Sequence, residues 1–189
     1  DSNYIVKKYH RSASHWYHDN NDLPEAIHHA LCADEIEFAA DLIESIWAEM
    51  DQNIQGSQWL KLARKLPNHI IRQRPVLNVG YAWALIDSGD LDTCMERLEE
   101  TEKQIDSSDM SLQDKNYIVY DQEQFKNLPA NIASAYAYIA AAKGNSEDVL
   151  FYADKALTLV GDDNKVRKSI VQILLSFYYW SKGELLQSL

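Results

Sequence analysis

Glycine and proline are scarce in this chain, with 6 and 4 residues among 189. A β-sandwich or barrel needs a turn about every 8–12 residues, and such turns draw on these two residue types. The shortage therefore argues against both architectures. With 46% hydrophobic residues the chain is too apolar for a disordered tail. Its length suits one ordinary domain with a sizeable core.

The chain also lacks any apolar run near the roughly 20 residues of a membrane span. Its first residues, Asp1–Asn3, begin no signal-peptide segment. The two cysteines, Cys32 and Cys94, lie far apart and form no CxxC or Cys/His pattern. We therefore expect two free, buried thiols in a reducing cytosol. Together these absences predict a cytoplasmic protein without a membrane partner.

Positive charge is in short supply as well. The 18 Lys and Arg residues stand against 29 Asp and Glu residues, which gives a formal net charge of −11. Because contacts with phosphates dominate the affinity of proteins for nucleic acids, this balance disfavours direct binding to DNA or RNA.

Signatures of catalysis are missing. The chain has no GxSxG, Walker or GxGxxG motif, and neither cysteine carries the pattern of a Cys/His enzyme. Five histidines gather near the N-terminus: His10, His15, His18, His28 and His29. His15 and His18 could share a helix face, but no third ligand lies at a fixed spacing. We therefore expect no enzyme, no metal site and no cofactor in this chain.

The chain does contain a succession of amphipathic helical patterns, with apolar side chains three and four residues apart. Helices are predicted over 5–19, 25–33, 35–51, 58–66, 75–88, 92–105, 130–143, 147–160 and 165–182, followed by a fragment at 184–189. Asp34 and Ser146 are the predicted N-caps of two of them. Residues 117–120 fit a short helix or an extended run, and the pattern does not decide between these.

Turn residues recur between these helices, at Asn21, Gly56, Gly89, Gly144 and Gly183. Their separations of 35, 33, 55 and 39 residues, with two helices per period, are typical of tetratricopeptide-like solenoids. We predict an all-α fold, a right-handed superhelix of antiparallel helix pairs, as a single domain over 1–189. Its repeats are expected at about 3–34, 35–70, 75–106, 129–161 and 165–189, the last incomplete, with an insertion at 107–127.

Small residues are expected where paired helices approach closely: Ala26, Ala30, Ala33, Ala82, Ala137, Ala153 and Ala156. In such a solenoid the first helix of each pair lines the concave groove. Counting back from the turns places there Arg11, His15, His18, Asp19, Val79, Trp83, Asp87, Asn131, Ser134, Tyr138, Ile173, Phe177 and Trp180. Aromatic faces with a few convergent polar groups suit a small-molecule or sugar pocket. Alternatively, Trp83, Phe177 and Trp180 pack the core between repeats, as we expect of Trp16 and Trp47.

Two blocks of the sequence resemble a known family. The blocks comprise Tyr9–Tyr17, Leu23–Leu31 and Ala39–Glu44, then Trp59–Pro67, Arg74–Pro75, Ala82–Leu85 and Gly89–Asp92. Over about residues 9–100 the chain is similar to the segment that follows the nucleotide-binding module in large ATP-dependent, MalT-like transcriptional activators of the LuxR family. The resemblance implies a piece of a larger bacterial regulator, with ATP bound in an upstream domain outside this chain and a helix-turn-helix further downstream.

The resemblance also implies a superhelical sensor that binds an inducer and self-associates. We expect a small-molecule inducer or a regulatory protein in the groove, acting through its differential affinity for two states. The alternative is a tetratricopeptide scaffold that binds proteins only. Because the chain ends inside a repeat, Phe177, Tyr178, Trp180 and Leu185 are expected to be partly exposed and to favour self-association through that end.

Overall fold

The computed structural model describes residues 2–106, 117–161 and 165–183. The helices of this part are α1 (Ser2–Asp19), α2 (Leu23–Cys32), α3 (Ile36–Ser45), α4 (Trp47–Gln52), α5 (Gly56–Ala63), α6 (Asn68–Arg72), α7 (Pro75–Ile86), α8 (Leu91–Asp106), α9 (Gln122–Lys126), α10 (Leu128–Ala142), α11 (Ser146–Leu159) and α12 (Lys165–Ser181). Over the described residues no strand is present, so the predicted all-α class is confirmed. None of these helices combines the length and apolarity needed to cross a bilayer.

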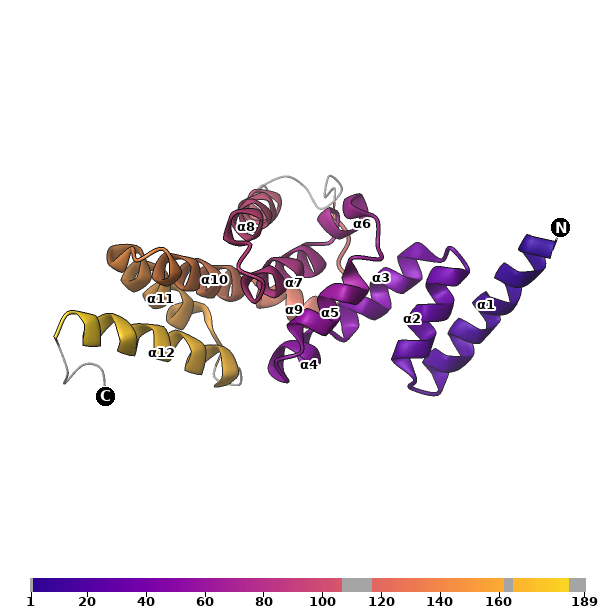
Figure 1. Cartoon of the computed structure of the whole chain (residues 1–189), viewed down its shortest axis with the longest axis horizontal. Helices are drawn as coiled ribbons and strands as arrows, with labels where there is room; N and C mark the ends of the chain where they lie inside the picture. Colours follow the sequence, from indigo (N-terminus) through magenta and orange to yellow (C-terminus); the bar gives the residue numbers. More distant parts are fainter. Residues whose placement is uncertain (1, 107–116, 162–164, 184–189) are drawn as a thin grey trace.

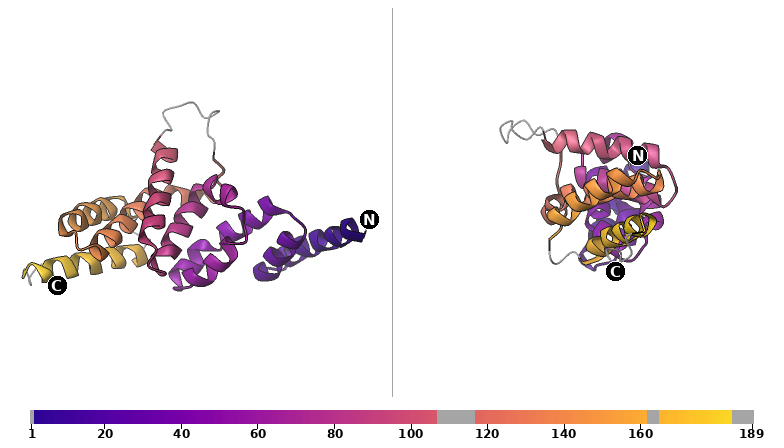
Figure 2. Two further views of the ribbon diagram at one scale, coloured as in Figure 1. Left: turned by 45° about the horizontal axis from the view of Figure 1, so that its top comes forward. Right: turned by 90° about the vertical axis from the view of Figure 1, so that its left-hand side faces the viewer.

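Apart from α9, which lies beside α7 and α3, the helices follow one another along the array in the order of the chain. Helix α1 packs against α2, α7 against α8 and α10 against α11, each pair joined by a tight turn. Helix α2 also contacts α3, and α12 packs on both α10 and α11. Figure 1 shows an elongated array with α1 at one end and α12 at the other, and the end-on view in Figure 2 superposes these elements in one narrow cross-section.

Residues in the left-handed conformation end several of these helices. Four predicted turn residues have positive φ: Asn21 (59°), Gly89 (77°), Gly144 (73°) and Gly183 (76°). The turn predicted at Gly56 is wrong, because Ile54 takes the left-handed conformation (φ 57°) and Gly56 begins α5. The missing side chain of Gly56 serves another purpose, since a Cβ atom there would lie 3.0 Å from Asp87 Oδ2.

The long helix predicted over 35–51 is two helices, α3 and α4, that meet at Ile46. Two distant side chains bind the backbone carbonyls at the break. Trp59 Nε1 donates to the Ile43 oxygen at 2.9 Å, and Gln124 Nε2 donates to the Glu44 oxygen at 3.2 Å. In an uninterrupted helix these carbonyls would accept only backbone N–H groups of the next turn. The two side-chain donors replace such bonds and favour ending α3 here.

Both predicted N-caps are wrong by one residue. Glu35 holds the cap position of α3, whereas Asp34 is left-handed (φ 57°) and forms an ion pair with Lys7 of α1. Asn145 caps α11, where its side chain accepts the backbone N–H of Asp148. A short Asp or Asn side chain tolerates the left-handed conformation, so a hairpin turn competes with the cap for the same residue type.

The predicted insertion at 107–127 is described only from residue 117. Residues 117–119 form no helix or strand, and Ile118 donates its N–H to the Gln73 oxygen at 2.8 Å. Helix α9 follows, capped by the Asp121 side chain, and the sequence patterns missed both this helix and α6. The predicted helical fragment at 184–189 lies outside the described residues.

The core extends along the array from Ala26 to Leu174. The predicted small residues of the paired helices are all buried: Ala26, Ala30, Ala33, Ala82, Ala137, Ala153 and Ala156. Trp47 is buried as expected, but Trp16 is exposed, since it belongs to α1 at the end of the array, where α2 is the main packing partner. Cys32 is free but exposed, which corrects its predicted burial, whereas Cys94 is buried and burial raises the pKa of its thiol to about 12.

Candidate functional site

A cavity of about 260 Å³, the central cavity, is lined by residues of α4, α5, α7, α10 and α12. Its lining residues are Trp47, Asp51, Ile54, Gly56, Trp83, Ala84, Ile86, Asp87, Tyr138, Arg167 and Ile170. Three of the predicted groove residues, Trp83, Asp87 and Tyr138, meet here. They come from α7, from the residue that ends it, and from α10. Helices that are separate in sequence therefore converge on one hollow.

Helix α7 sets two of these side chains. It begins at Pro75, which costs no hydrogen bond at this position, and it is buried along almost its whole length. Trp83 and Asp87 are four residues apart and therefore share a face. On the same helix Gly80 leaves room for the opposite wall, since a Cβ atom there would lie 2.9 Å from Trp47 Cδ2.

The remaining wall is a buried ion pair. Arg167 Nη2 donates to Asp51 Oδ2 at 2.7 Å, and Arg167 is only 3% exposed. Its guanidinium carbon lies 4.0 Å from the centroid of the Trp83 ring, a cation–π contact. Trp83 in turn donates its indole N–H to the Asn131 oxygen at 3.2 Å. Sequence reasoning missed Asp51 and Arg167, which are 116 residues apart.

The electrostatics of the cavity are unbalanced. Burial raises the pKa of Asp51, the guanidinium of Arg167 opposes that rise, and the charge of Asp87 adds to it. Burial also raises the pKa of Asp87. The Asp87 carboxylate has no hydrogen bond or ion pair with any residue in the described part of the chain. Among the described lining residues, two carboxylates therefore face one guanidinium, which Asp51 already binds.

The predicted groove residues of α1 form a separate group: Arg11, His15, His18 and Asp19. Arg11 Nε lies 2.6 Å from Glu35 Oε1, and the His15 ring stacks on Phe38 with centroids 4.6 Å apart. His18 meets the edge of the same Phe38 ring. These side chains surround the start of α3, at the end of the array opposite α12 (Figure 1). The structure does not bring them to the cavity.

The other predicted groove residues are divided between the core and the surface. Val79 and Ser134 are fully buried, and the side-chain oxygen of Asn131 is buried without a hydrogen-bond partner among the described residues. Phe177 and Trp180 are 64% and 66% exposed and line a shallow hollow of α12 with Ile173 and Ser176. The two α12 aromatics therefore lie outside the cavity and outside the core.

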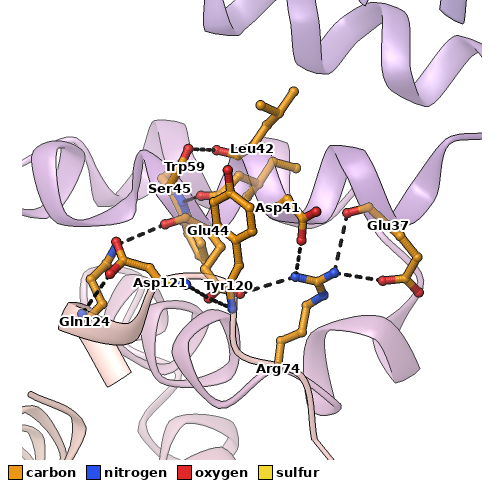
Figure 3. A network of polar contacts seen from close by, with 11 residues as sticks. Glu37, Asp41, Leu42, Glu44, Ser45, Trp59, Arg74, Tyr120, Asp121 and Gln124 are labelled. Atoms are coloured by element: carbon orange, nitrogen blue, oxygen red, sulfur yellow. Dashed lines mark hydrogen bonds and ion pairs between the residues drawn. The ribbon is translucent and has the colours of Figure 1, made fainter. Parts of the chain in front are cut away.

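A second buried arginine lies in a different setting. Arg74 is 2% exposed and donates to Glu37 Oε2 at 2.8 Å and to Asp41 Oδ1 at 2.7 Å, while Glu44 Oε2 lies 3.5 Å away (Figure 3). Glu44 is fully buried and accepts the backbone N–H groups of Tyr120 and Asp121, both at 3.0 Å. Burial raises the pKa of Glu44, and those two N–H groups and Arg74 oppose the rise.

This Arg74 network fixes the segment that precedes α9. Tyr120 and Asp121 are bound to α3 through Glu44, and Gln124 donates to the Glu44 backbone oxygen. Figure 3 shows these groups pointing toward one another from α3, from Arg74 and from the segment before α9. The arrangement closes a packed interior with the chain's own backbone.

Some of the histidines of α1 and α2 also lie in contact with one another. His10 Nδ1 and His29 Nδ1 lie 2.7 Å apart, and His28 Nε2 lies 3.8 Å from Cys32 Sγ. Burial lowers the pKa of His29, and the neighbouring His10 and His28 lower it further. Over the described residues, no group of three or more His, Cys, Asp or Glu side chains is arranged to hold a metal ion.

Comparison with known proteins gives one partial likeness. Over 81 residues the chain is 35% identical to the serine/threonine-protein kinase PknK of Mycobacterium tuberculosis (strains CDC 1551 / Oshkosh and ATCC 25618 / H37Rv) and of Mycobacterium bovis (strain ATCC BAA-935 / AF2122/97). The match covers 43% of this chain and 7% of the kinase. No protein family and no solved structure matches the chain significantly. A likeness over so small a part of the kinase assigns this chain to no family.

Proposed function

We propose that this chain is the effector-sensing and oligomerisation segment of a larger MalT-like regulator of the LuxR family, and that a small inducer binds in the central cavity. In this proposal the helices form a right-handed, tetratricopeptide-like superhelix, and ATP binds in a domain outside the chain. The left-handed turn residues, the hairpins in chain order and the sequence resemblance over residues 9–100 support it. The match to a short part of a much longer kinase is consistent with a segment of a large protein.

The observation that carries this proposal is the convergence of distant segments on one cavity. Its lining residues come from four separate parts of the chain, within 47–56, 83–87 and 167–170 and at 138. A ligand held there contacts helices from several predicted repeats at once. Its binding free energy therefore depends on how those helices sit relative to one another, which is the requirement for shifting a conformational equilibrium.

Fluorine NMR of protein labelled with 5-fluorotryptophan tests the proposal directly, because the five tryptophans report on different places. Trp47 and Trp83 line the cavity, and Trp16 is exposed at the far end of the array. A library of small metabolites, oligosaccharides included, is first screened by thermal unfolding. We expect at least one compound to shift the Trp83 resonance saturably and to leave the Trp16 resonance in place.

The Trp83→Phe variant assigns the resonance, and Arg11→Ala is the matched control, since Arg11 is a predicted groove residue that lies away from the cavity. Binding should survive Arg11→Ala. A library in which no compound moves the Trp83 resonance contradicts the proposal, and so does binding that depends on Arg11.

The exposed aromatic stripe of α12 supports a second candidate function, a protein-binding scaffold. Ile173, Phe177 and Trp180 follow the i, i+4, i+7 spacing with which a helix presents one face to a partner. We expect light scattering to show concentration-dependent self-association of the chain that is lost in Phe177→Ser. A chain that stays monomeric at high concentration, with Phe177 intact, contradicts this candidate.

A further inference from the structure

We infer that the ligand of the central cavity is an organic cation, a small ammonium or guanidinium compound with an apolar body. This inference rests on the proposed function, because it names the chemical class of the effector for the same cavity. It depends on the charges, the aromatic walls and the size of that cavity.

The charges of the cavity disfavour an anionic ligand. Arg167, the one cation among its described lining residues, is 3% exposed and already engaged by Asp51 and by the Trp83 ring. An entering carboxylate or phosphate would therefore meet Asp87 and Asp51 without a guanidinium free to receive it. A cation would meet the carboxylate of Asp87, which is exposed, lines the hollow and has no ion pair among the described residues.

The aromatic walls also favour a positive charge. The Trp83 ring already holds one cation, the Arg167 guanidinium, at 4.0 Å. The faces of Trp and Tyr rings attract cations through their quadrupole, and the attraction grows as water is excluded. Trp47 and the half-exposed Tyr138 present two further aromatic rings to the same hollow, and Asp87 lies among them.

The size and the apolar residues define the rest of the ligand. A volume of about 260 Å³ lies below the roughly 300–1,000 Å³ of pockets for drug-sized molecules, which indicates a compact compound. Ile54, Ile86 and Ile170 line the same hollow and provide apolar contacts. The complementary ligand therefore has one cationic group and a short hydrocarbon or aromatic body.

Two matched series of probes test the inference by varying charge at constant size. The first is 2-phenylethylamine, 2-phenylethanol and phenylacetate, and the second is n-butylamine, n-butanol and butyrate. Each is titrated while the Trp83 fluorine resonance is followed. We expect the better-binding amine to bind about tenfold more tightly than its alcohol, the ratio of one charge-assisted hydrogen bond, and the carboxylates to give no shift.

Asp87→Asn is the decisive variant. We expect it to weaken binding of the amine about tenfold, to leave binding of the alcohol unchanged, and to leave the fold intact. Asp19→Asn is the matched control, since Asp19 is a predicted groove acid that lies away from the cavity, and it should change neither. Equal affinities for amine and alcohol, or an amine affinity that Asp87→Asn leaves unchanged, would overturn the inference.

The outcome also separates this inference from the proposed function. A neutral or anionic library compound that moves the Trp83 resonance, while no amine does, leaves the cavity as an effector site and refutes the cationic class. A Trp83 resonance that moves with no compound at all refutes both.

Discussion

Arg74 and Arg167, two of the three buried arginines in the described part of the chain, have different surroundings. Arg74 faces the carboxylates of Glu37, Asp41 and Glu44, and backbone N–H groups from the segment before α9 bind the deepest of these. Arg167 binds the carboxylate of Asp51 and lies over the Trp83 indole ring, beside a cavity. The two residues are therefore chemically identical and almost equally buried, with exposed fractions of 2% and 3%.

The difference lies in what surrounds each arrangement. Around Arg74 the backbone N–H groups of Tyr120 and Asp121 cover Glu44, although Arg74 Nε is buried without a hydrogen-bond partner among the described residues. Around Arg167 the described residues leave a hollow that the exposed Asp87 carboxylate also lines. A polar network covered by the chain's own backbone is architecture, whereas a charged wall that faces a hollow has a place for a ligand.

The largest effect is expected from Arg74→Met. The substitution leaves Glu44 buried without its counter-charge, and breaking a buried ion pair by removing one partner costs about 3–5 kcal/mol. Urea denaturation measures the loss in the free energy of unfolding. Arg72→Met is the matched control: Arg72 also pairs with two carboxylates, but at the surface, so we expect a loss below about 1 kcal/mol. Equal losses in the free energy of unfolding of the two variants would contradict a structural role of the Arg74 network.

Arg167→Met should destabilise the protein less, by about 2 kcal/mol, because its partner Asp51 is 25% exposed and can regain water. The same denaturation experiment gives the value, and the Trp83 fluorine resonance should shift as the cation–π contact is lost. A loss larger than that of Arg74→Met would reverse the comparison and make Arg167 the main structural arginine.

Gly80→Ala is expected to cost about 1–2 kcal/mol by overpacking, because the new methyl group meets the rings of Trp47 and Trp59. Gly56→Ala is its control: the closest atom there is the mobile carboxylate of Asp87, which can turn aside. We therefore expect only a small change in stability from Gly56→Ala but a weaker ligand response. A larger destabilisation from Gly56→Ala than from Gly80→Ala would contradict the packing described for the cavity walls.

The smallest effect is a pH-dependent gain from Asp87→Asn. A carboxyl group with a raised pKa binds its proton more tightly in the folded state, so it lowers stability as the pH rises through that pKa. Asp87→Asn should therefore be more stable than the parent chain at pH 7, by less than about 0.5 kcal/mol after solvent screening. The gain should vanish near the ordinary Asp pKa of about 4. A variant less stable than the parent at pH 7 would show that Asp87 has a structural partner.

The parts of the fold that the sequence predicted are local. Amphipathic spacing located the long helices, and left-handed turn residues located four of the five turns. The break at Ile46 depends on donors from Trp59 and Gln124, which no spacing reveals. Helices α6 and α9 have five residues each, too few turns for a periodic pattern.

The residues of the candidate site likewise divide into those that local spacing predicted and those that only the tertiary fold brings together. Trp83 and Asp87 share one helix at a spacing of four, and Tyr138 holds the matching place in the next hairpin, so a repeat-based count found all three. Asp51 and Arg167 meet only through the tertiary fold. The same count grouped Arg11, His15, His18 and Asp19 with them, but α1 lies at the far end of an elongated array, where its side chains pack on α3.

The most direct test compares two tryptophans during one titration. Trp83 lines the cavity beside Arg167, whereas Trp16 is exposed on α1 at the far end of the array (Figure 1). With 2-phenylethylamine or n-butylamine as titrant and 5-fluorotryptophan as label, we expect the Trp83 resonance to move saturably and the Trp16 resonance to stay. Resonances that move together, or a Trp83 resonance that does not move, would contradict the assignment of the Arg167 cavity as the ligand site.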